Sequence, residues 1–319
     1  MDRPPEADAD EAPPGHLLFG HVPLGHSRKY WTYRGLSAAL QAVPGPLAGG
    51  LASVAGLTMS QLWRDRRPVI RANLRRVVGP DLSDAALERL VTGAFDSYAK
   101  YWVESARLVA MRPAEVFRRF SIEGFDRVEE EMAKHHGAIL ALPHLGFWDL
   151  GGAWLTLKGY PMTTVAEALE PPDLFEWFRA QREALGLTIL EFGPGTSGRL
   201  AAALRAGRLV GLVADRDLVG NGVAVEFFGE VTTLPGGSAV LALRTGAPLF
   251  PSIVYQRPGG KGHGVIRPPI EMERTDNLRA DVTRLTRMLA AEFEQLIRQA
   301  PEQWHMFQPN WPSDREKYG

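Results

Sequence analysis

The stretch "GAILALPHLGFWDLGGAW", residues 137–154, carries the pattern from which the fold is predicted. It opens with a short apolar run that ends in a proline, as expected of a buried strand. A histidine follows directly, and "FWDLGGAWL" then begins an apolar segment with helical spacing. We therefore predict a strand over 137–143 and a helix over 148–158, with His144 in the loop between them.

The same alternation continues toward the C-terminus. Further strands are predicted over residues 162–167, 187–192, 209–214, 223–228, 249–255 and 263–268. Helical patterns cover residues 173–186, 198–206, 236–245 and 280–299. Strands that alternate with helices predict an α/β fold, in which a central, mostly parallel sheet is flanked by helices on both faces.

The chain before this region divides into two parts. Residues 1–30 are expected to form a disordered or irregular leader, because residues 1–15 are charged and proline-rich without periodicity and an irregular segment follows them. Residues 31–319 are expected to form a single domain, with N-terminal helices over 31–120 and the α/β catalytic core over 121–319. One of those helices is predicted over 83–109 from its apolar spacing.

Three histidines in the leader, His16, His21 and His26, each follow a glycine at five-residue spacing. Metal binding by these imidazoles is one interpretation. A five-residue step does not stack ligands on one helical face, however, and no cysteine or carboxylate accompanies them. The pattern therefore favours an irregular segment, and no metal site is predicted.

Composition narrows the function classes. The chain is 45% hydrophobic with a net charge of −1, which is typical of a globular protein and gives no case for a nucleic-acid partner. The absence of cysteine excludes disulfides, thiolate zinc sites and a cysteine acyl-enzyme. No G-x-S-x-G or phosphate-binding loop is present, since "PGGSAV", residues 235–240, lacks the second glycine.

An uncharged stretch over residues 36–63 is long enough to span a bilayer. Pro44, Pro46 and several glycines interrupt it, so we predict two short apolar helices around a turn. Residues 64–76 then carry six arginines against one aspartate. Apolar helices beside a basic cluster are typical of a chain that lies on an anionic membrane surface. A solvated basic helix beside ordinary core helices is an equally supported interpretation.

His144 and Asp149 form the first candidate site. In an open α/β sheet, functional residues follow the carboxyl ends of strands, as His144 does. Asp149 lies in the first turns of the next helix, from which its carboxylate could fold back toward the imidazole. A carboxylate on one ring nitrogen leaves the other free to take a proton from an attacking hydroxyl, with no protein nucleophile. The alternative is a core histidine satisfied by a capping acid.

A second cluster, Asp215, Arg216 and Asp217, ends the predicted strand over 209–214. Buried carboxylates are costly unless they are paired, so a group like this usually holds something in place. Structurally, Arg216 could instead neutralise the two acids.

A dinucleotide-binding oxidoreductase is the rival from another class. Gly193, Gly195 and Gly198 form a G-x-G-x-x-G, and Asp215 follows 22 residues after the first glycine, near where a ribose-binding acid would lie. Pro194 stiffens this loop, and the motif follows a strand–helix pair that already carries the better site. A glycine-rich turn is therefore favoured over a cofactor loop.

Several motifs together resemble the lysophospholipid acyltransferase-like superfamily, whose hallmark is the H-x-x-x-x-D of His144 and Asp149. Within it, the chain looks most like the actinobacterial phosphatidylinositol mannoside acyltransferases. The resemblance runs from about residue 30 to the end and rests on "SYAKYWVESARL" (97–108), "ALPHLGFWDLGGAWL" (141–155), "TTVAEALEP" (163–171), "FRAQREALG" (178–186), "ADRDLVGNGVAVEFFGE" (214–230) and "WHMFQPNW" (304–311).

The resemblance implies transfer of a fatty acyl group, typically palmitoyl, from acyl-CoA to a mannose hydroxyl of a phosphatidylinositol mannoside. Acyl-CoA is then a co-substrate, and no cofactor is needed. The enzyme would work peripherally on the cytoplasmic face of the plasma membrane. Another glycolipid acceptor, such as one of lipid A type, is an alternative, and a non-catalytic lipid carrier is a third possibility.

The same resemblance suggests roles for individual residues. It makes His144 the general base and Asp149 its partner. Asp215 stands where the family shows the glutamate of E-R-D, an acid that assists the histidine, so this chain departs from the pattern there. Arg182 would hold head-group or phosphate oxygens, and Glu167 would lie near the sugar.

The remaining expectations concern the walls of the site. Arg216 and Asp217 are expected to contact substrate, and Phe147, Trp148 and Trp154 to line the acyl pocket. Acyl transfer also needs donors for the oxyanion, and the backbone amides at the helix start after His144 are the predicted ones.

Overall fold

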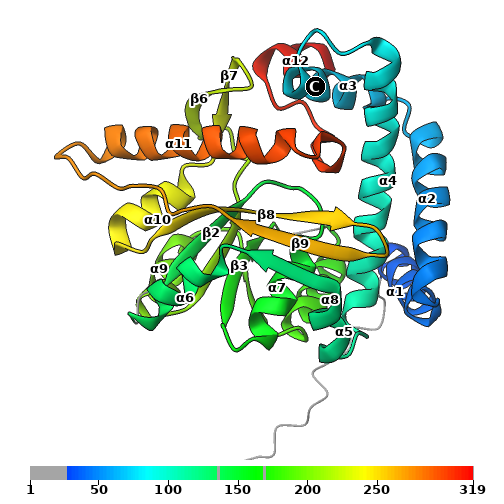
Figure 1. Ribbon diagram of the computed structural model, residues 1–319, viewed down its shortest axis with the longest axis horizontal. Coiled ribbons are helices and arrows are strands. Elements are labelled where there is room, and N and C mark those ends of the chain that lie inside the picture. The colour runs from blue at the N-terminus through cyan, green and yellow to red at the C-terminus, as the bar shows by residue number, and fades with distance from the viewer. Residues whose placement is uncertain (1–26, 135–136, 168–169, 319) are drawn as a thin grey trace, which may run out of the picture.

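The computed structural model describes residues 27–134, 137–167 and 170–318, and a seven-stranded sheet lies at its centre (Figure 1). The strands are ordered β1-β9-β8-β2-β5-β3-β4. Their bounds are β1 Phe120–Glu123, β2 Ala138–Leu142, β3 Met162–Ala166, β4 Leu187–Glu191, β5 Leu209–Val213, β8 Leu249–Arg257 and β9 Lys261–Ile266. Five neighbours from β8 to β4 run parallel, whereas β9 is antiparallel to β8 and β1 follows β9. The predicted mostly parallel α/β sheet is therefore confirmed.

Three short strands differ from the prediction. The predicted strand over 223–228 is β6 (Val223–Phe227), but it pairs only with β7 (Glu230–Leu234), in a separate antiparallel hairpin. β1 and β7 were not predicted. β1 is only four residues long and half of them are exposed, so it lacks a continuous apolar run.

Helices cover both faces of the sheet because its central strands are apolar on both sides. Along β2, Leu140 packs into the core on one side, whereas Ile139 and Ala141 pack into the core on the other. The first face carries α6 (Phe125–Ala133) and α7 (Trp148–Leu157). The second face carries α9 (Thr196–Arg205), α10 (Gly237–Thr245) and α11 (Leu278–Arg298), and α8 (Pro172–Glu183) packs near β4.

The N-terminal helices lie at the end of the sheet toward which β8 points in Figure 1. They are α1 (Arg28–Ala42), α2 (Gly45–Leu62), α3 (Arg66–Val78), α4 (Asp84–Leu108) and α5 (Pro113–Arg119). The prediction of two helices around a turn is confirmed by α1 and α2, but only α2 is uncharged, because α1 begins at Arg28 and its first half is polar. Of the helices that the structure describes, none is both long and apolar enough to cross a membrane.

The predicted boundaries are off by a few residues. α1 begins at Arg28, before the expected end of the leader at residue 30. The expected start of the core at residue 121 falls inside β1, which already belongs to the sheet. His16, His21 and His26 lie outside the described residues.

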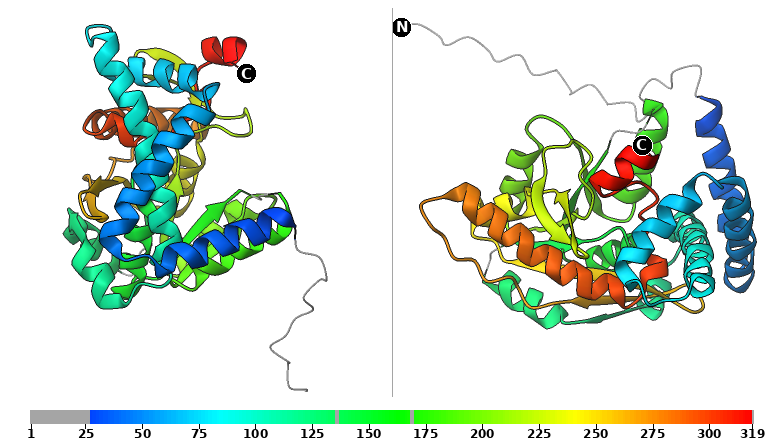
Figure 2. Two further views of the ribbon diagram at one scale, coloured as in Figure 1. Left: turned by 90° about the vertical axis from the view of Figure 1, so that its right-hand side faces the viewer. Right: turned by 90° about the horizontal axis from the view of Figure 1, so that it is seen from above.

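Small residues bring α2 close to α4. Ala48 and Ala52 are buried between the two helices, and a Cβ on Gly56 would lie 2.7 Å from the Cα of Asp96. With its small residues turned inward, α2 turns its large apolar residues outward. Those at least half exposed are Leu47, Leu51, Val54, Leu57 and Leu62. Figure 2 (left) shows α2 lying over α4 on the outside of the molecule, with α1 turned away beside α8.

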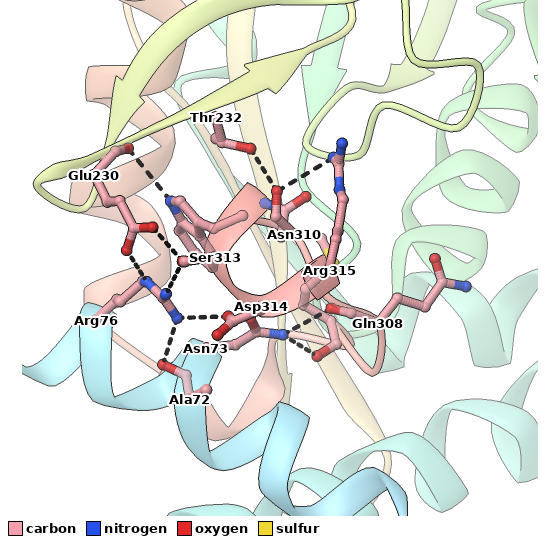
Figure 3. A network of polar contacts seen from close by, with 12 residues as sticks. Ala72, Asn73, Arg76, Glu230, Thr232, Gln308, Asn310, Ser313, Asp314 and Arg315 are labelled. Carbon is pink, nitrogen blue, oxygen red and sulfur yellow. Dashed lines mark hydrogen bonds and ion pairs between the residues drawn. The ribbon is translucent and has the colours of Figure 1, made fainter. Parts of the chain in front are cut away.

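Most arginines of residues 64–76 are neutralised within the protein. In Figure 3, Arg76 lies between Glu230 of β7 and Asp314 of α12 (Pro312–Tyr318), with Nε 2.7 Å and Nη1 2.6 Å from their carboxylates. Asn73, on the same helix, donates to the backbone carbonyls of Met306 and Gln308. This network ties α3 to the β6–β7 hairpin and to the C-terminal segment.

The other arginines of α3 pair with α4. Arg67 and Arg71 contact Glu88, and Arg71 and Arg75 contact Asp84. The stretch therefore carries less unpaired positive charge than either interpretation assumed, and its contact with an anionic membrane stays a prediction. Four of its six arginines are engaged in ion pairs that fasten α3 to its neighbours.

Candidate active site

His144 and Asp215 face each other across two neighbouring strands. Leu142 and Val213 are register partners at the ends of β2 and β5, and His144 and Asp215 each lie two residues farther on. The imidazole Nδ1 is 2.6 Å from the Asp215 Oδ1, and the His144 amide donates to Oδ2 at 3.0 Å. Because a carboxylate accepts hydrogen bonds, this contact assigns the proton to Nδ1 and leaves the Nε2 lone pair free.

Asp215 is fully buried and holds its charge through hydrogen bonds. The Trp304 indole Nε1 donates to Oδ2 at 2.7 Å. Burial would raise the pKa of Asp215, but His144, Trp304 and the His144 amide outweigh it, so the pKa lies below its ordinary value. The acid therefore remains ionised at neutral pH and orients the imidazole.

Asp149 does not meet the imidazole, in contrast to our prediction. Its carboxylate accepts hydrogen bonds from Tyr101 Oη at 3.0 Å and Ser105 Oγ at 2.9 Å, both on α4. Arg182, on α8, donates Nε and Nη2 to it at 3.1 Å each. α7 turns Asp149 toward these two helices and away from the loop of His144. The acid next to His144 in the structure is Asp215.

Arg182 is likewise committed to the protein. Two of its nitrogens bind Asp149. Arg182 also lines the cavity beside His144, and a role in holding head-group or phosphate oxygens stays a prediction. Burial would lower the pKa of Arg182, but Asp149 outweighs burial and raises it, so the guanidinium stays charged. Burial, followed by the Asp149 charge, also raises the pKa of Tyr101, which remains protonated. Together, Asp149, Arg182 and Tyr101 fasten α7 to α4 and α8 behind His144.

A cavity of about 810 Å³ opens beside His144, whose side chain is 25% exposed. Its walls are apolar side chains from the strands and from α7, among them Leu140, Ile189 and Leu155. Trp148 lines this cavity, as predicted. Phe147 and Trp154 do not, because both are buried in the core on the α7 side of the sheet.

Two charged residues of the prediction lie at the mouth of the cavity. Glu167 and Arg216 both line it, and their side chains approach to 3.7 Å. Asp217 lines it too, but its carboxylate accepts from the amides of Val219, Gly220 and Gly222. Burial would raise the pKa of Asp217, and these amides lower it. The Asp217 carboxylate therefore stabilises its own loop. Arg216 does not neutralise Asp215 and Asp217, the two acids beside it in the sequence.

Aromatic rings hold Trp148 in place. It stacks on Tyr101 with ring centroids 4.1 Å apart and meets His144 edge-on at 5.9 Å. His305 packs behind it, with Nε2 2.9 Å from Ser97 Oγ. Burial, and then the nearby His144, lower the pKa of His305 to about 3, so this second imidazole is neutral.

Four residues of this site were not predicted individually: Tyr101, Ser105, Trp304 and His305. All four lie in the stretches 97–108 and 304–311, which contributed to the family resemblance but received no roles. The His305 amide donates to the His144 carbonyl at 2.7 Å, and Leu145 forms a β-bridge with Trp304. These contacts join segments about 160 residues apart in the sequence, which no local pattern reveals.

The amides of the loop before α7 are already in use. Those of residues 144–147 donate to the Asp215 carboxylate and to the carbonyls of Pro143, Gln303 and Val254. The amides of Trp148 and Asp149, at the helix start that we predicted to stabilise the oxyanion, donate to no acceptor among the described residues, so that role stays a prediction.

The glycine-rich loop over residues 193–198 is a turn. The oxidoreductase alternative is further weakened because its candidate ribose-binding acid is not available. Gly195 adopts a φ of 81° and caps α9, while the Gly193 amide donates to Thr196 Oγ1 at 3.1 Å. Asp215, the candidate ribose-binding acid, is fully buried against His144 and Trp304.

Comparison with known proteins agrees with this geometry. The family described as "Bacterial lipid A biosynthesis acyltransferase" matches residues 21–313. A "Phosphatidylinositol mannoside acyltransferase" of Mycolicibacterium smegmatis is 38% identical over 304 residues, 93% of this chain and 96% of the relative. One of Mycobacterium tuberculosis is 39% identical over 77% of each chain. A "Lipid A biosynthesis acyltransferase" of Haemophilus influenzae is 25% identical over 83% of this chain and 81% of its own.

Proposed function

Since the chain belongs to the bacterial lipid A biosynthesis acyltransferase family and is an acyltransferase, we propose that it transfers a fatty acyl group from acyl-CoA to a mannose hydroxyl of a phosphatidylinositol mannoside. The relatives named for this acceptor support that choice, because they are 38–39% identical, against 25% for the relative named for lipid A.

The observation that carries the proposal is the His144–Asp215 pair beside a large apolar cavity. Acyl transfer from a thioester needs a base for the alcohol and a dry place for the acyl chain. Asp215 holds the proton on Nδ1, so Nε2 is the basic nitrogen that remains. His144 thereby meets the first need, and the apolar walls around Leu140 and Ile189 meet the second.

The reaction then needs no acyl-enzyme. His144 Nε2 takes the proton of the mannose hydroxyl as its oxygen bonds to the thioester carbonyl carbon. The carbon–sulfur bond breaks in turn, and the CoA sulfur receives the proton from His144. The products are the acylated mannoside and free CoA, and Asp215 stabilises the imidazolium that forms in between.

Donor and acceptor occupy different parts of the cavity in this proposal. Its volume lies within the range of ligand sites, roughly 300–1,000 Å³, and its apolar interior suits a long chain such as palmitoyl. Glu167 and Arg216 at the mouth offer an acceptor and a donor for sugar hydroxyls. The side chain of Glu167 is 56% exposed, so an incoming sugar can reach it.

The test is acyl transfer with the purified full chain and palmitoyl-CoA against several acceptors. We expect CoA release, and an acylated product in the mass spectrum, with phosphatidylinositol mannoside and little of either with a lipid A precursor or without acceptor. Equal turnover with the lipid A precursor would assign another glycolipid. Tight acyl-CoA binding without release on any acceptor would instead indicate a carrier.

We also propose that the outward side of α1 and α2 lies on the membrane that holds the acceptor, at the cytoplasmic face of the plasma membrane. The exposed leucines and valine of α2 support this, because no charged residue interrupts that helix. Since most arginines of α3 are paired, burial of apolar side chains is expected to supply most of the affinity. Arg64, which has no ion pair in the described part of the chain, is the best placed to add charge.

Replacing Leu47, Leu51 and Val54 by serine is expected to lower binding to neutral and anionic vesicles alike. Each buried side chain contributes roughly 1.5–3 kcal/mol, so the triple variant should bind more than about a hundredfold more weakly. Arg64→Gln should weaken only anionic binding, by about 1 kcal/mol. Val231→Ser, an exposed valine on the β6–β7 hairpin, is the matched control in vesicle sedimentation. Sedimentation of the triple variant like the wild type would contradict the proposed surface.

A further inference from the structure

The proposed reaction lacks a group that stabilises the oxyanion. When the acceptor oxygen attacks, the thioester carbonyl oxygen gains negative charge, and hydrogen-bond donors aimed at it are usually a large contribution to catalysis. The amides of residues 144–147 cannot serve, because each already donates within the protein. Donors can come from the start of α7, where the amides of Trp148 and Asp149 have no acceptor among the described residues, or from another part of the cavity wall.

The N-terminus of α10 lies at the same edge of the sheet as His144. α10 leads directly into β8, which runs parallel to β2. A helix that precedes a parallel strand runs back across the sheet, so its N-terminus lies at the carboxyl ends of the strands. Consistent with this, Gly236, Gly237 and Ser238 line the same cavity as His144.

The first turn of α10 is rich in unused donors. Its N-cap, Gly236, has no side chain to cap the helix, and the first helical hydrogen bond runs from the Val240 amide to the Gly236 carbonyl. Within the described part of the chain, the amides of residues 237–239 donate to no acceptor. A Cβ on Gly237 would find no atom within 4 Å, so open space adjoins this turn.

Ser238 adds a buried hydroxyl to these amides. The residue is 2% exposed, and its Oγ has no hydrogen-bond partner among the described residues. A buried hydroxyl without a partner costs free energy, roughly 1–3 kcal/mol, unless a ligand satisfies it. The hydroxyl and the amides thus form one set of donors in the cavity wall, at the positive end of a helix dipole.

The chemistry of this set favours a carbonyl oxygen. None of the α10 residues that line the cavity is cationic: they are Gly236, Gly237, Ser238, Val240 and Leu241. Phosphate groups are usually met by arginine or lysine. Neutral donors suit an oxygen that is uncharged in the substrate and becomes negative only during the reaction.

We propose that the N-terminus of α10, together with Ser238 Oγ, binds the carbonyl oxygen of the acyl thioester and stabilises the oxyanion formed from it. This rests on the proposed function. As the acceptor oxygen bonds to the carbonyl carbon, the C=O electron pair moves onto this oxygen and its negative charge meets the α10 donors. The pair returns when the carbon–sulfur bond breaks, and the CoA sulfur takes the proton held by His144.

The test compares Ser238→Ala with the wild type on two donors, palmitoyl-CoA and palmitoyl-N-acetylcysteamine, which has a thioester but no phosphate. Loss of one oxyanion donor typically lowers kcat by about 10²–10³-fold. With the helix amides still present, we expect a loss of at least about tenfold, equal for both donors, with KM for the donor changed by less than about threefold. Thr286→Val is the matched control, because this buried hydroxyl lies beside Gly236 but outside the cavity.

A second variant, Gly237→Val, projects a side chain into the open space beside the turn and should lower kcat similarly while thermal unfolding stays unchanged. An unchanged kcat in both variants would overturn the inference. A loss confined to palmitoyl-CoA and expressed as a raised KM would overturn it too, by showing that the turn binds a CoA phosphate. If the wild type transfers no acyl group from either donor, the proposed function itself fails.

Discussion

Replacing His144 by alanine is expected to lower the turnover of acyl transfer by roughly 10²–10⁴-fold, which is the usual contribution of a general base. The imidazole is held in place from several sides. Asp215 fixes its tautomer, Trp148 packs against its edge, and the His305 amide holds its carbonyl. Without it, the mannose hydroxyl loses the ring nitrogen that takes its proton in the proposed reaction.

The fold should survive this change. Asp215 keeps two of its hydrogen bonds, from the Trp304 indole and from the backbone amide of residue 144. Steady-state kcat for CoA release and thermal unfolding, measured on the same preparation, therefore check both halves of the prediction. His263→Ala is the control, since this histidine bonds Ser121 at the edge of the sheet, away from the cavity. Near-normal turnover of His144→Ala would remove the residue from the mechanism.

The sequence predicts the strands and helices well where their patterns are long. The buried strands over 137–143 and 209–214 are continuous apolar runs, and both appear within a residue or two of the prediction. The sequence does not predict, however, that these two strands are neighbours in the sheet. Nothing local shows that β5, which comes after β3 and β4 in the chain, inserts next to β2.

That missing adjacency explains the error in the acid partner. Five residues separate His144 from Asp149 and 71 separate it from Asp215, so a reading along the chain favours the nearer acid. The sheet reverses this order, because strand register puts Asp215 opposite His144 while the helix turns Asp149 away. Asp215, which stands where the resemblance implies a glutamate, is therefore the acid that directly contacts the His144 imidazole.

The sequence also does not predict in which direction side chains point at the start of a helix. Phe147 and Trp148 are adjacent and both large, so we expected the same role for both. In the structure, Phe147 points into the core and Trp148 into the cavity, since α7 begins between them. The ion pairs of the α3 arginines could not be predicted either, because their acids lie on other elements: α4, β7 and α12.

Replacing Asp149 by alanine is expected to destabilise the fold, by about 3–5 kcal/mol, because it leaves the Arg182 guanidinium buried without its counter-charge. Two hydroxyls, of Tyr101 and Ser105, lose their acceptor as well. Urea unfolding of the full chain gives the free energy directly. The control is Glu176→Ala, which breaks an exposed pair with Arg179 on the same helix as Arg182 and should cost less than about 1 kcal/mol.

The double variant Asp149→Leu, Arg182→Met separates charge from packing. Replacing a buried ion pair by apolar residues of similar size is often neutral, so the double variant should recover most of the lost stability. A histidine partner would behave in the opposite way: Asp149→Asn would abolish turnover while the free energy of unfolding stayed near that of the wild type. That result would make Asp149, rather than Asp215, the functional partner of the imidazole. A loss of stability that the double variant restores would instead show that Asp149 fastens α7 to its neighbours behind His144.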